Sequence, residues 1–99
     1  MFLGFDGAEI TRALSDVSAL DGTSATFECG VRLGQGSVAW YHDDTLLPHS
    51  DEFQQFYDGS TAKLVITEVF PDDAGRYRCV AKSRDSEADT TANLTITRK

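Results

Sequence analysis

The stretch Asp73–Cys79, with the sequence DAGRYRC, decides the fold of this chain. It ends in one of only two cysteines, and it places a tyrosine two residues before that cysteine. The other cysteine, Cys29, closes an alternating run, and the only tryptophan, Trp40, follows it by 11 residues. Two cysteines on facing strands, an indole packed against them and a tyrosine at the corner entering the second strand indicate a two-sheet β-sandwich.

Apolar residues alternate with polar ones on both sides of this stretch, which indicates strands with one face in a core and one face in water. A first strand is expected over Ile10–Leu20, broken near Asp16, with Val17–Leu20 parallel to the last strand. The residues expected to face inward are Ala25, Phe27, Cys29, Val31, Val38, Trp40, Ala62, Leu64, Ile66, Tyr77, Cys79, Ala81, Ala88, Thr90, Ala92, Leu94 and Ile96.

Turn-forming residues separate these strands. Asp21-Gly22 and Asp58-Gly59-Ser60 indicate tight turns, and Pro71-Asp72-Asp73 predicts a single helical turn. Gly34–Ser37 is expected to form a loop. The segment Ser83–Glu87 lacks a common Asn-x-x-Gly turn sequence, so whether it forms a hairpin is left open. Further strands are predicted at Leu46-Leu47 and at Phe53–Tyr57, where the alternation does not decide whether Phe56 or Tyr57 faces inward.

The chain resembles an immunoglobulin domain of the intermediate (I-set) type, from about Glu9 to Thr97. Phe27-x-Cys29-x-Val31, Val38-x-Trp40-Tyr41, Leu64-x-Ile66 and the Asp73, Gly75, Tyr77, Cys79 run carry this resemblance. The 23 residues between Trp40 and Leu64 leave no room for the extra hairpin of a variable domain. The resemblance implies an all-β sandwich of two antiparallel sheets with Greek-key connections, in which Asp73 caps local backbone amides.

The overall composition fits one globular domain. The chain has 99 residues, of which 40% are hydrophobic and 25% are charged, and its net charge is −7. Such an acidic chain is not expected to bind nucleic acid or an anionic membrane surface. We expect residues 1–8 to be the end of an interdomain linker or a cloning remnant, and residues 9–99 to be the single domain. Neither a signal peptide nor a membrane span is predicted.

No residue pattern indicates catalysis or metal binding, so the sequence predicts no catalytic, cofactor or metal site. His42 and His49 have no neighbour of triad type. Asp43-Asp44 and Asp72-Asp73 occupy turn positions that favour aspartate and lack the spacing of a calcium loop. Asn93-Leu94-Thr95 is a glycosylation sequon, a triplet that also arises by chance.

The oxidation state of the cysteine pair is left open by the sequence. Inside a cell Cys29 and Cys79 would stay reduced, whereas outside it they would form a disulfide. Their inward positions predict a role in the core and not in redox chemistry.

Two outward patches are candidate contacts for a protein partner. The first places Tyr41 and Val80 beside Arg78 and Lys82 on the outer face of one sheet, an aromatic and basic composition enriched in interfaces. The second is Phe70, which is expected to face solvent at the corner before Pro71. For both patches the alternative is an ordinary exposed residue without a function.

The resemblance implies a non-catalytic module of an intracellular, muscle-type (titin-like) protein of the sarcomere or cytoskeleton. Such modules act as spacers and as docking surfaces for neighbouring immunoglobulin or fibronectin type III modules or cytoskeletal proteins. Two alternatives remain: an extracellular module of an adhesion or receptor protein, and a regulatory domain beside a kinase. The fold alone does not choose among them.

Overall fold

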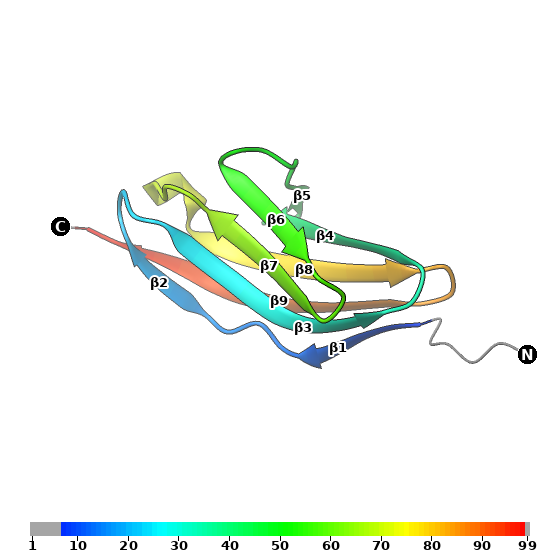
Figure 1. The fold of residues 1–99 in the computed structure, drawn as a ribbon. Helices are drawn as coiled ribbons and strands as arrows, with labels where there is room; N and C mark the ends of the chain where they lie inside the picture. The colour runs from blue at the N-terminus through cyan, green and yellow to red at the C-terminus, as the bar shows by residue number, and fades with distance from the viewer. Residues whose placement is uncertain (1–6, 99) are drawn as a thin grey trace, which may run out of the picture.

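The computed structural model describes residues 7–98, which form two packed β-sheets (Figure 1). The first sheet contains, in order, β1 (Ala8–Arg12), β3 (Ala25–Leu33), β7 (Thr61–Ile66) and β6 (Phe53–Tyr57). The second contains β2 (Val17–Leu20), β9 (Glu87–Thr97), β8 (Gly75–Ser83), β4 (Gly36–His42) and β5 (Thr45–Leu46). The single helical turn, η1, spans Pro71–Asp73. This is the all-β sandwich that the sequence predicts, and the described part of the chain has no helix that could cross a membrane.

The break in the first strand is confirmed. β1 pairs antiparallel with β3, whereas β2 pairs parallel with β9 in the other sheet. Between them the buried Leu14 donates its amide to the hydroxyl of Thr90, 3.1 Å away, and Asp16 accepts the amide of Asn93. The split strand therefore closes one side of the sandwich. Most of the N-terminal segment predicted as a linker, residues 1–6, lies outside the described residues, and β1 begins at Ala8.

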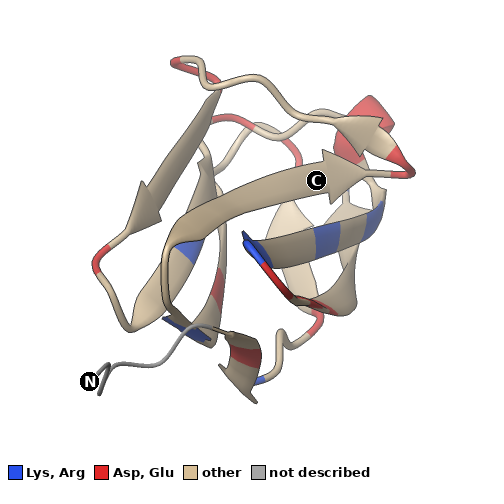
Figure 2. Ribbon diagram, turned by 90° about the vertical axis from the view of Figure 1, so that its right-hand side faces the viewer, with Lys and Arg blue, Asp and Glu red and all other residues tan. Residues whose placement is uncertain are grey.

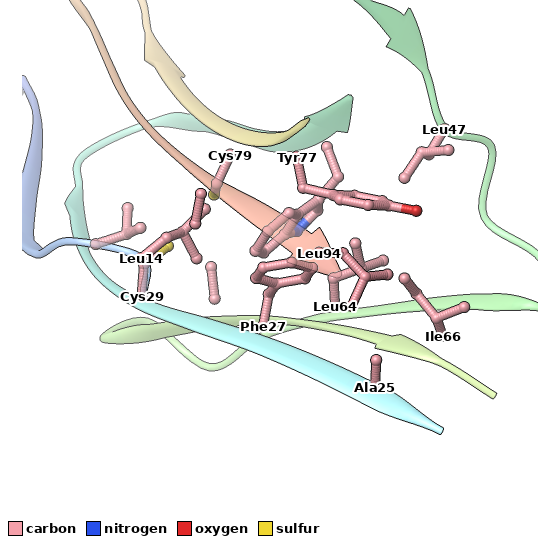
Figure 3. Packing of buried hydrophobic residues seen from close by; sticks show 14 of the residues in the cluster. Leu14, Ala25, Phe27, Cys29, Leu47, Leu64, Ile66, Tyr77, Cys79 and Leu94 are labelled. Atoms are coloured by element: carbon pink, nitrogen blue, oxygen red, sulfur yellow. The ribbon is translucent and has the colours of Figure 1, made fainter. Parts of the chain in front are cut away.

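The core lies between the sheets and contains most of the predicted inward residues (Figure 3). Val38 and Ile96 are partly buried against it, and Ala88 and Thr90 are half-buried and do not belong to the core cluster. Trp40, Phe27 and Tyr77 are its largest side chains, each with an exposed fraction of 1% or less. The rings of Phe27 and Tyr77 pack with their centroids 5.0 Å apart. Leu64 and both cysteines are fully buried beside them. Burial of this apolar surface is the main stabilising contribution to the fold.

The corner before β8 is held by hydrogen bonds, as the resemblance implies. The hydroxyl of Tyr77 donates to the carbonyl of Asp73 at 2.7 Å, and the carboxylate of Asp73 accepts the amide of Phe70 at 2.8 Å. Gly75 has φ = 133°, a conformation that disfavours other residues, and a Cβ there would collide with the carboxylate of Asp43. Asp73, Gly75 and Tyr77 therefore act together to fix the entry to β8.

Two boundaries differ from those that the sequence predicts. β4 begins at Gly36, opposite Ser83, so the loop predicted over Gly34–Ser37 is shorter than expected. A Cβ on Gly36 would collide with the backbone of Lys82, so the glycine serves close strand pairing and not a loop. The strand predicted at Leu46-Leu47 is β5, over Thr45–Leu46, and the Leu47 amide still donates to the carbonyl of Trp40.

The structure also answers two questions that the sequence leaves open. Ser83–Glu87 does form a tight connection, because the Ser83 amide donates to the carbonyl of Ser86 and the Ser83 hydroxyl accepts the Ser86 amide. In β6, Tyr57 pairs with the inward-facing Ala62, whereas Phe56 pairs with the outward-facing Lys63. Tyr57 therefore lies on the inner side at the sheet edge and Phe56 on the outer side.

Candidate protein-interaction surfaces

The cysteine pair lies in the core, where solvent does not reach it. Cys29 and Cys79 are free thiols with exposed fractions of 0%. A hydrogen bond between the two side chains raises the pKa of Cys79, together with burial, and lowers the pKa of Cys29. Inaccessible thiols are chemically inert, so the pair contributes packing and not a reactive site.

The histidines do not form a catalytic arrangement. His42 stacks on the ring of Tyr77 at a centroid distance of 4.4 Å, and its Nε2 lies 2.9 Å from the carbonyl of Ala74. Its nearest carboxylate, that of Asp43, also accepts the amide of Arg76 and so belongs to the turn. His49 is exposed in the loop after β5. Within residues 7–98 no cluster of His, Cys, Asp or Glu side chains could hold a metal ion.

The predicted sheet-face patch is brought together on β4 and β8. Tyr41 lies opposite Arg78, and the guanidinium of Arg78 is 5.7 Å from the centre of the Tyr41 ring. Lys82 is exposed at the far end of β8. The expectation of an exposed Val80 is wrong, because only 6% of Val80 is exposed.

Val80 is covered although it points away from the core between the sheets. Its partners across the sheet are Ala39 and Asp89, and Arg78 on the same face donates to the carboxylate of Asp89 at 2.8 Å. Long charged side chains cover apolar surface with their stems when their heads are held in place. Val80 therefore forms the floor of the patch and not part of its surface.

Acidic neighbours pair with two of the basic side chains on β8, Arg76 and Arg78. Arg78 pairs with Asp89 at 2.8 Å, and Arg76 pairs with Asp44 at 3.4 Å. Hydrogen bonding to Asp89 is the main cause of the raised pKa of Arg78. Figure 2 shows Lys and Arg as bands along strands, with Asp and Glu at several turns. The sheet face is a mixed-charge surface, and not the basic patch that the sequence alone indicates.

The second predicted patch lies at the corner before η1. Phe70 is 52% exposed, as expected, while its neighbour Val69 is fully buried. A depression beside it is lined by Asp21, Gly22, Glu68, Phe70, Pro71 and Arg98. The structure therefore places the two predicted patches on different parts of the molecule.

A third feature, which the sequence analysis missed, is a hollow on the side of the sandwich opposite the split strand. It has a volume of ≈ 90 Å³ and is lined by Val38, Trp40, His49, Gln55, Phe56 and Tyr57. These residues come from β4, β6 and the connection between β5 and β6. The residues that could have indicated this hollow are apolar ones, the half-buried Val38 and the exposed Phe56 and Tyr57. Alternation within each strand does not show that these residues lie close together.

Comparison with known proteins identifies a matching family model and shows similarity to parts of two larger proteins, titin and telokin. The model of the immunoglobulin I-set domain matches residues 8–96. Titin of Drosophila melanogaster is 35% identical over 85 residues, which are 84% of this chain and, after rounding, 0% of titin. Telokin of Meleagris gallopavo is 34% identical over 88 residues, which are 87% of this chain and 57% of telokin.

The fold comparison agrees with the sequence comparison. A chain in the crystal structure of the complex between titin M10 and an obscurin-like 1 immunoglobulin domain superimposes with a TM-score of 0.86 and 29% identity. The match covers 93% of this chain and 95% of that chain. Because the family model and the relatives span nearly all of the described residues, the chain belongs to the immunoglobulin I-set domain family.

Proposed function

We propose that this chain is a non-catalytic module of a larger intracellular muscle protein, where it acts as a spacer that bears load and contacts other proteins. The parallel pairing of β2 with β9 is the observation that carries the proposal. The described chain enters near one end of the sandwich and leaves at the other (Figure 1). Similarity to titin and telokin supports a place in the sarcomere or cytoskeleton.

The β2–β9 pair is suited to resist a pull on the chain ends. Val17–Leu20 aligns with Leu94–Thr97, close to where the chain leaves the domain. A pull along parallel strands loads their hydrogen bonds together and does not peel them apart one at a time. The ladder therefore has to shear before the core is exposed.

The register identifies which amides belong to this ladder. The Asp21 amide donates to the carbonyl of Thr97, and Leu20 is aligned with Thr97. Because pairing alternates along a parallel strand, the amides of Val17 and Ala19 point toward β9 and that of Ser18 points away. Proline at Ser18, which from sequence alone could remove a ladder donor, is therefore the control, and proline at Ala19 is the test.

Stretching single molecules of a polyprotein that contains this domain tests the spacer role. Ala19→Pro should lower the unfolding force, whereas Ser18→Pro, on the free edge of β2, should leave the force near that of the parent chain. Chemical denaturation of the same variants separates mechanical from equilibrium effects. Equal unfolding forces for the parent and Ala19→Pro would rule out the load-bearing ladder.

The sheet face of Tyr41, Arg78 and Lys82, with Val80 beneath it, is the proposed contact surface for a neighbouring module or cytoskeletal partner. Tyr41→Ala and Arg78→Glu should each weaken partner binding by about tenfold while the melting temperature barely changes. Phe70→Ala should have little effect on binding. The opposite pattern in a binding titration would move the contact to the corner before η1.

A further inference from the structure

The end of the sandwich at which β9 finishes also carries η1 and the turn between β2 and β3 (Figure 1). Three backbone hydrogen bonds of 2.8 Å tie these segments together. The Asp21 amide donates to the carbonyl of Thr97, the Gly22 amide to that of Val69, and the Val69 amide to that of Thr23. Residues 21–23, 69–73 and 97–98 therefore form one connected surface, called the exit end below.

Phe70 is presented on this surface by a fixed backbone. Its amide donates to the carboxylate of Asp73, and the Asp73 amide donates to the carbonyl of Phe70, both at 2.8 Å. The side chain of Phe70 is 52% exposed, although that of its neighbour Val69 is fully buried. An apolar side chain on a backbone that is already ordered loses little conformational entropy when it is covered. Phe70 is therefore a pre-organised contact residue.

The chain leaves the domain at the depression beside Phe70. Arg98 lines this depression and directly follows Thr97, the last residue of β9. A module that follows residue 99 in a longer polypeptide therefore starts within reach of the Phe70 ring. Such a tether raises the effective concentration of the module at this surface to the millimolar range for a short linker.

The small apolar area of the exit end favours a tethered partner over a separate protein. Phe70 is the exposed large apolar residue of the depression, and one aromatic side chain buries about 150–250 Å² at most. Specific contacts between separate proteins bury about 1,200–2,000 Å² in total. Contacts between domains of one chain are stable with less, because the linker has already brought the two surfaces together.

The charges at the exit end indicate what the partner surface carries. Asp21 and Glu68 line the depression with Arg98, and Asp72 is exposed in η1. None of the three carboxylates makes an ion pair within residues 7–98. Opposite charges across an interface mainly set its specificity, so a basic loop is favoured opposite these carboxylates.

We propose that the exit end docks the module that follows this one in the same polypeptide. The Phe70 ring packs against an apolar side chain of that module, and Asp21 and Glu68 lie beside its basic residues. This inference rests on the proposed role as a module of a larger protein. It adds a contact within one polypeptide to the sheet face of Tyr41 and Arg78, which is tested with a separate partner.

Nuclear magnetic resonance of the natural two-module fragment, this domain with the module that follows it, tests the docking. Amide shifts are compared with those of residues 1–99 alone, and shifts are expected at Gly22, Glu68 and Phe70. The two modules should also tumble as one body. In the fragment, Phe70→Ala should lower the ratio of docked to undocked molecules by about tenfold and return these amides toward their positions in the single domain.

Two matched controls separate the exit end from other exposed positions. Phe56→Ala removes an aromatic ring of nearly the same exposure, 50%, from the outer side of β6 and should leave the shifts and the tumbling unchanged. Glu68→Lys should release the following module, whereas Glu28→Lys, at an exposed position on β3, should not. All four positions are exposed, so the melting temperature of this domain should barely change.

Four outcomes would overturn the inference: shifts confined to the residues next to Arg98, independent tumbling of the two modules, equal effects of Phe70→Ala and Phe56→Ala, or no folded module after residue 99. Shifts at Gly22 and Phe70 that appear only when a separate protein is added would assign the exit end to that protein and would also overturn it. None of these results bears on the load-bearing role, which the Ala19→Pro stretching experiment measures on this domain. Failure of the docking and failure of the proposed function are therefore distinguishable.

Discussion

The two faces of β8 differ in what buries them. On the inner face Tyr77, Cys79 and Ala81 are fully buried by the opposite sheet. On the outer face the one buried side chain is Val80, which no sheet covers and which lies under its charged neighbours. Burial on the inner face follows from the fold, whereas burial on the outer face depends on which long side chains lie nearby. The face of the sheet to which a side chain points and its exposure to solvent are thus separate properties.

The largest loss of stability is expected from a change at the cysteine pair, on the inner face. Cys79→Ala leaves a small cavity in the inner face and should lower the free energy of unfolding by about 1–3 kcal/mol in urea denaturation. Because both thiols are free, reductant should leave the melting temperature of the parent chain unchanged. A disulfide would contribute about 4 kcal/mol, so a large fall in melting temperature with reductant would contradict free thiols in the natural protein.

The next effect tests the covered residue on the outer face. Val80→Ala removes two carbon atoms from a buried site. At roughly 0.8 kcal/mol for each buried carbon, it should lower the free energy of unfolding by about 1–2 kcal/mol. The matched control is Thr91→Ala on β9, an exposed position on the same face, aligned with Arg78. If the two variants unfold at the same urea concentration, Val80 is not covered in solution.

A third effect depends on pH and returns to the inner face. Burial, with the charges of Asp73 and Asp43, raises the pKa of Tyr77 above its ordinary value of 10.0. The folded state therefore keeps its proton where the unfolded state has lost it. The contribution of the protonated Tyr77 to the free energy of unfolding is complete below pH 10. It is lost as the pH rises above 10, by at most about 1.4 kcal/mol per pH unit.

Tyr77→Phe should flatten the alkaline fall in stability, measured by urea denaturation from pH 9 to the limit of reversible folding. The variant also loses the hydrogen bond to Asp73, so only the dependence on pH is diagnostic. Tyr57, whose pKa is also raised by burial and by Asp58, remains in both chains and cancels in the difference. An identical pH dependence for both chains would show that Tyr77 does not resist ionisation.

The smallest effect is expected at the ion pair over Val80. Arg78 and Asp89 are both partly exposed, and exposed pairs add little to stability. Asp89→Asn should leave the melting temperature nearly unchanged at low and high salt. A large loss with Asp89→Asn, matched by the loss with Val80→Ala, would show that the pair is what keeps Val80 dry.

Most of the sandwich could be predicted from the sequence, because the alternation of apolar and polar residues indicates the face of the sheet to which each side chain points. Cys29, Trp40, Leu64 and Tyr77 are buried, as predicted, because their period of two matches the strands. The start of β4 was misplaced because Gly36 suggests a loop, although here it permits close approach to β8.

The interaction surfaces were less predictable, because they depend on pairs of residues brought together by the fold. The neutralisation of Arg76 by Asp44 joins residues 32 positions apart in sequence. The hollow beside β4 requires Val38 and Tyr57 to meet across two sheets. No short stretch of sequence reveals these contacts, because they depend on the register of the strands and on the path of the chain after Pro48.

The parallel pairing of β2 with β9 also constrains how this domain is made. The hydroxyl of Thr97 donates to the carbonyl of Ala19, across 78 positions of sequence. During synthesis the strand at Val17–Leu20 leaves the ribosome early and has no partner until Leu94–Thr97 follows. The ladder that we propose bears load is therefore the last to be completed, and a nascent chain arrested before Leu94 exposes an unpaired strand to its neighbours on the same messenger.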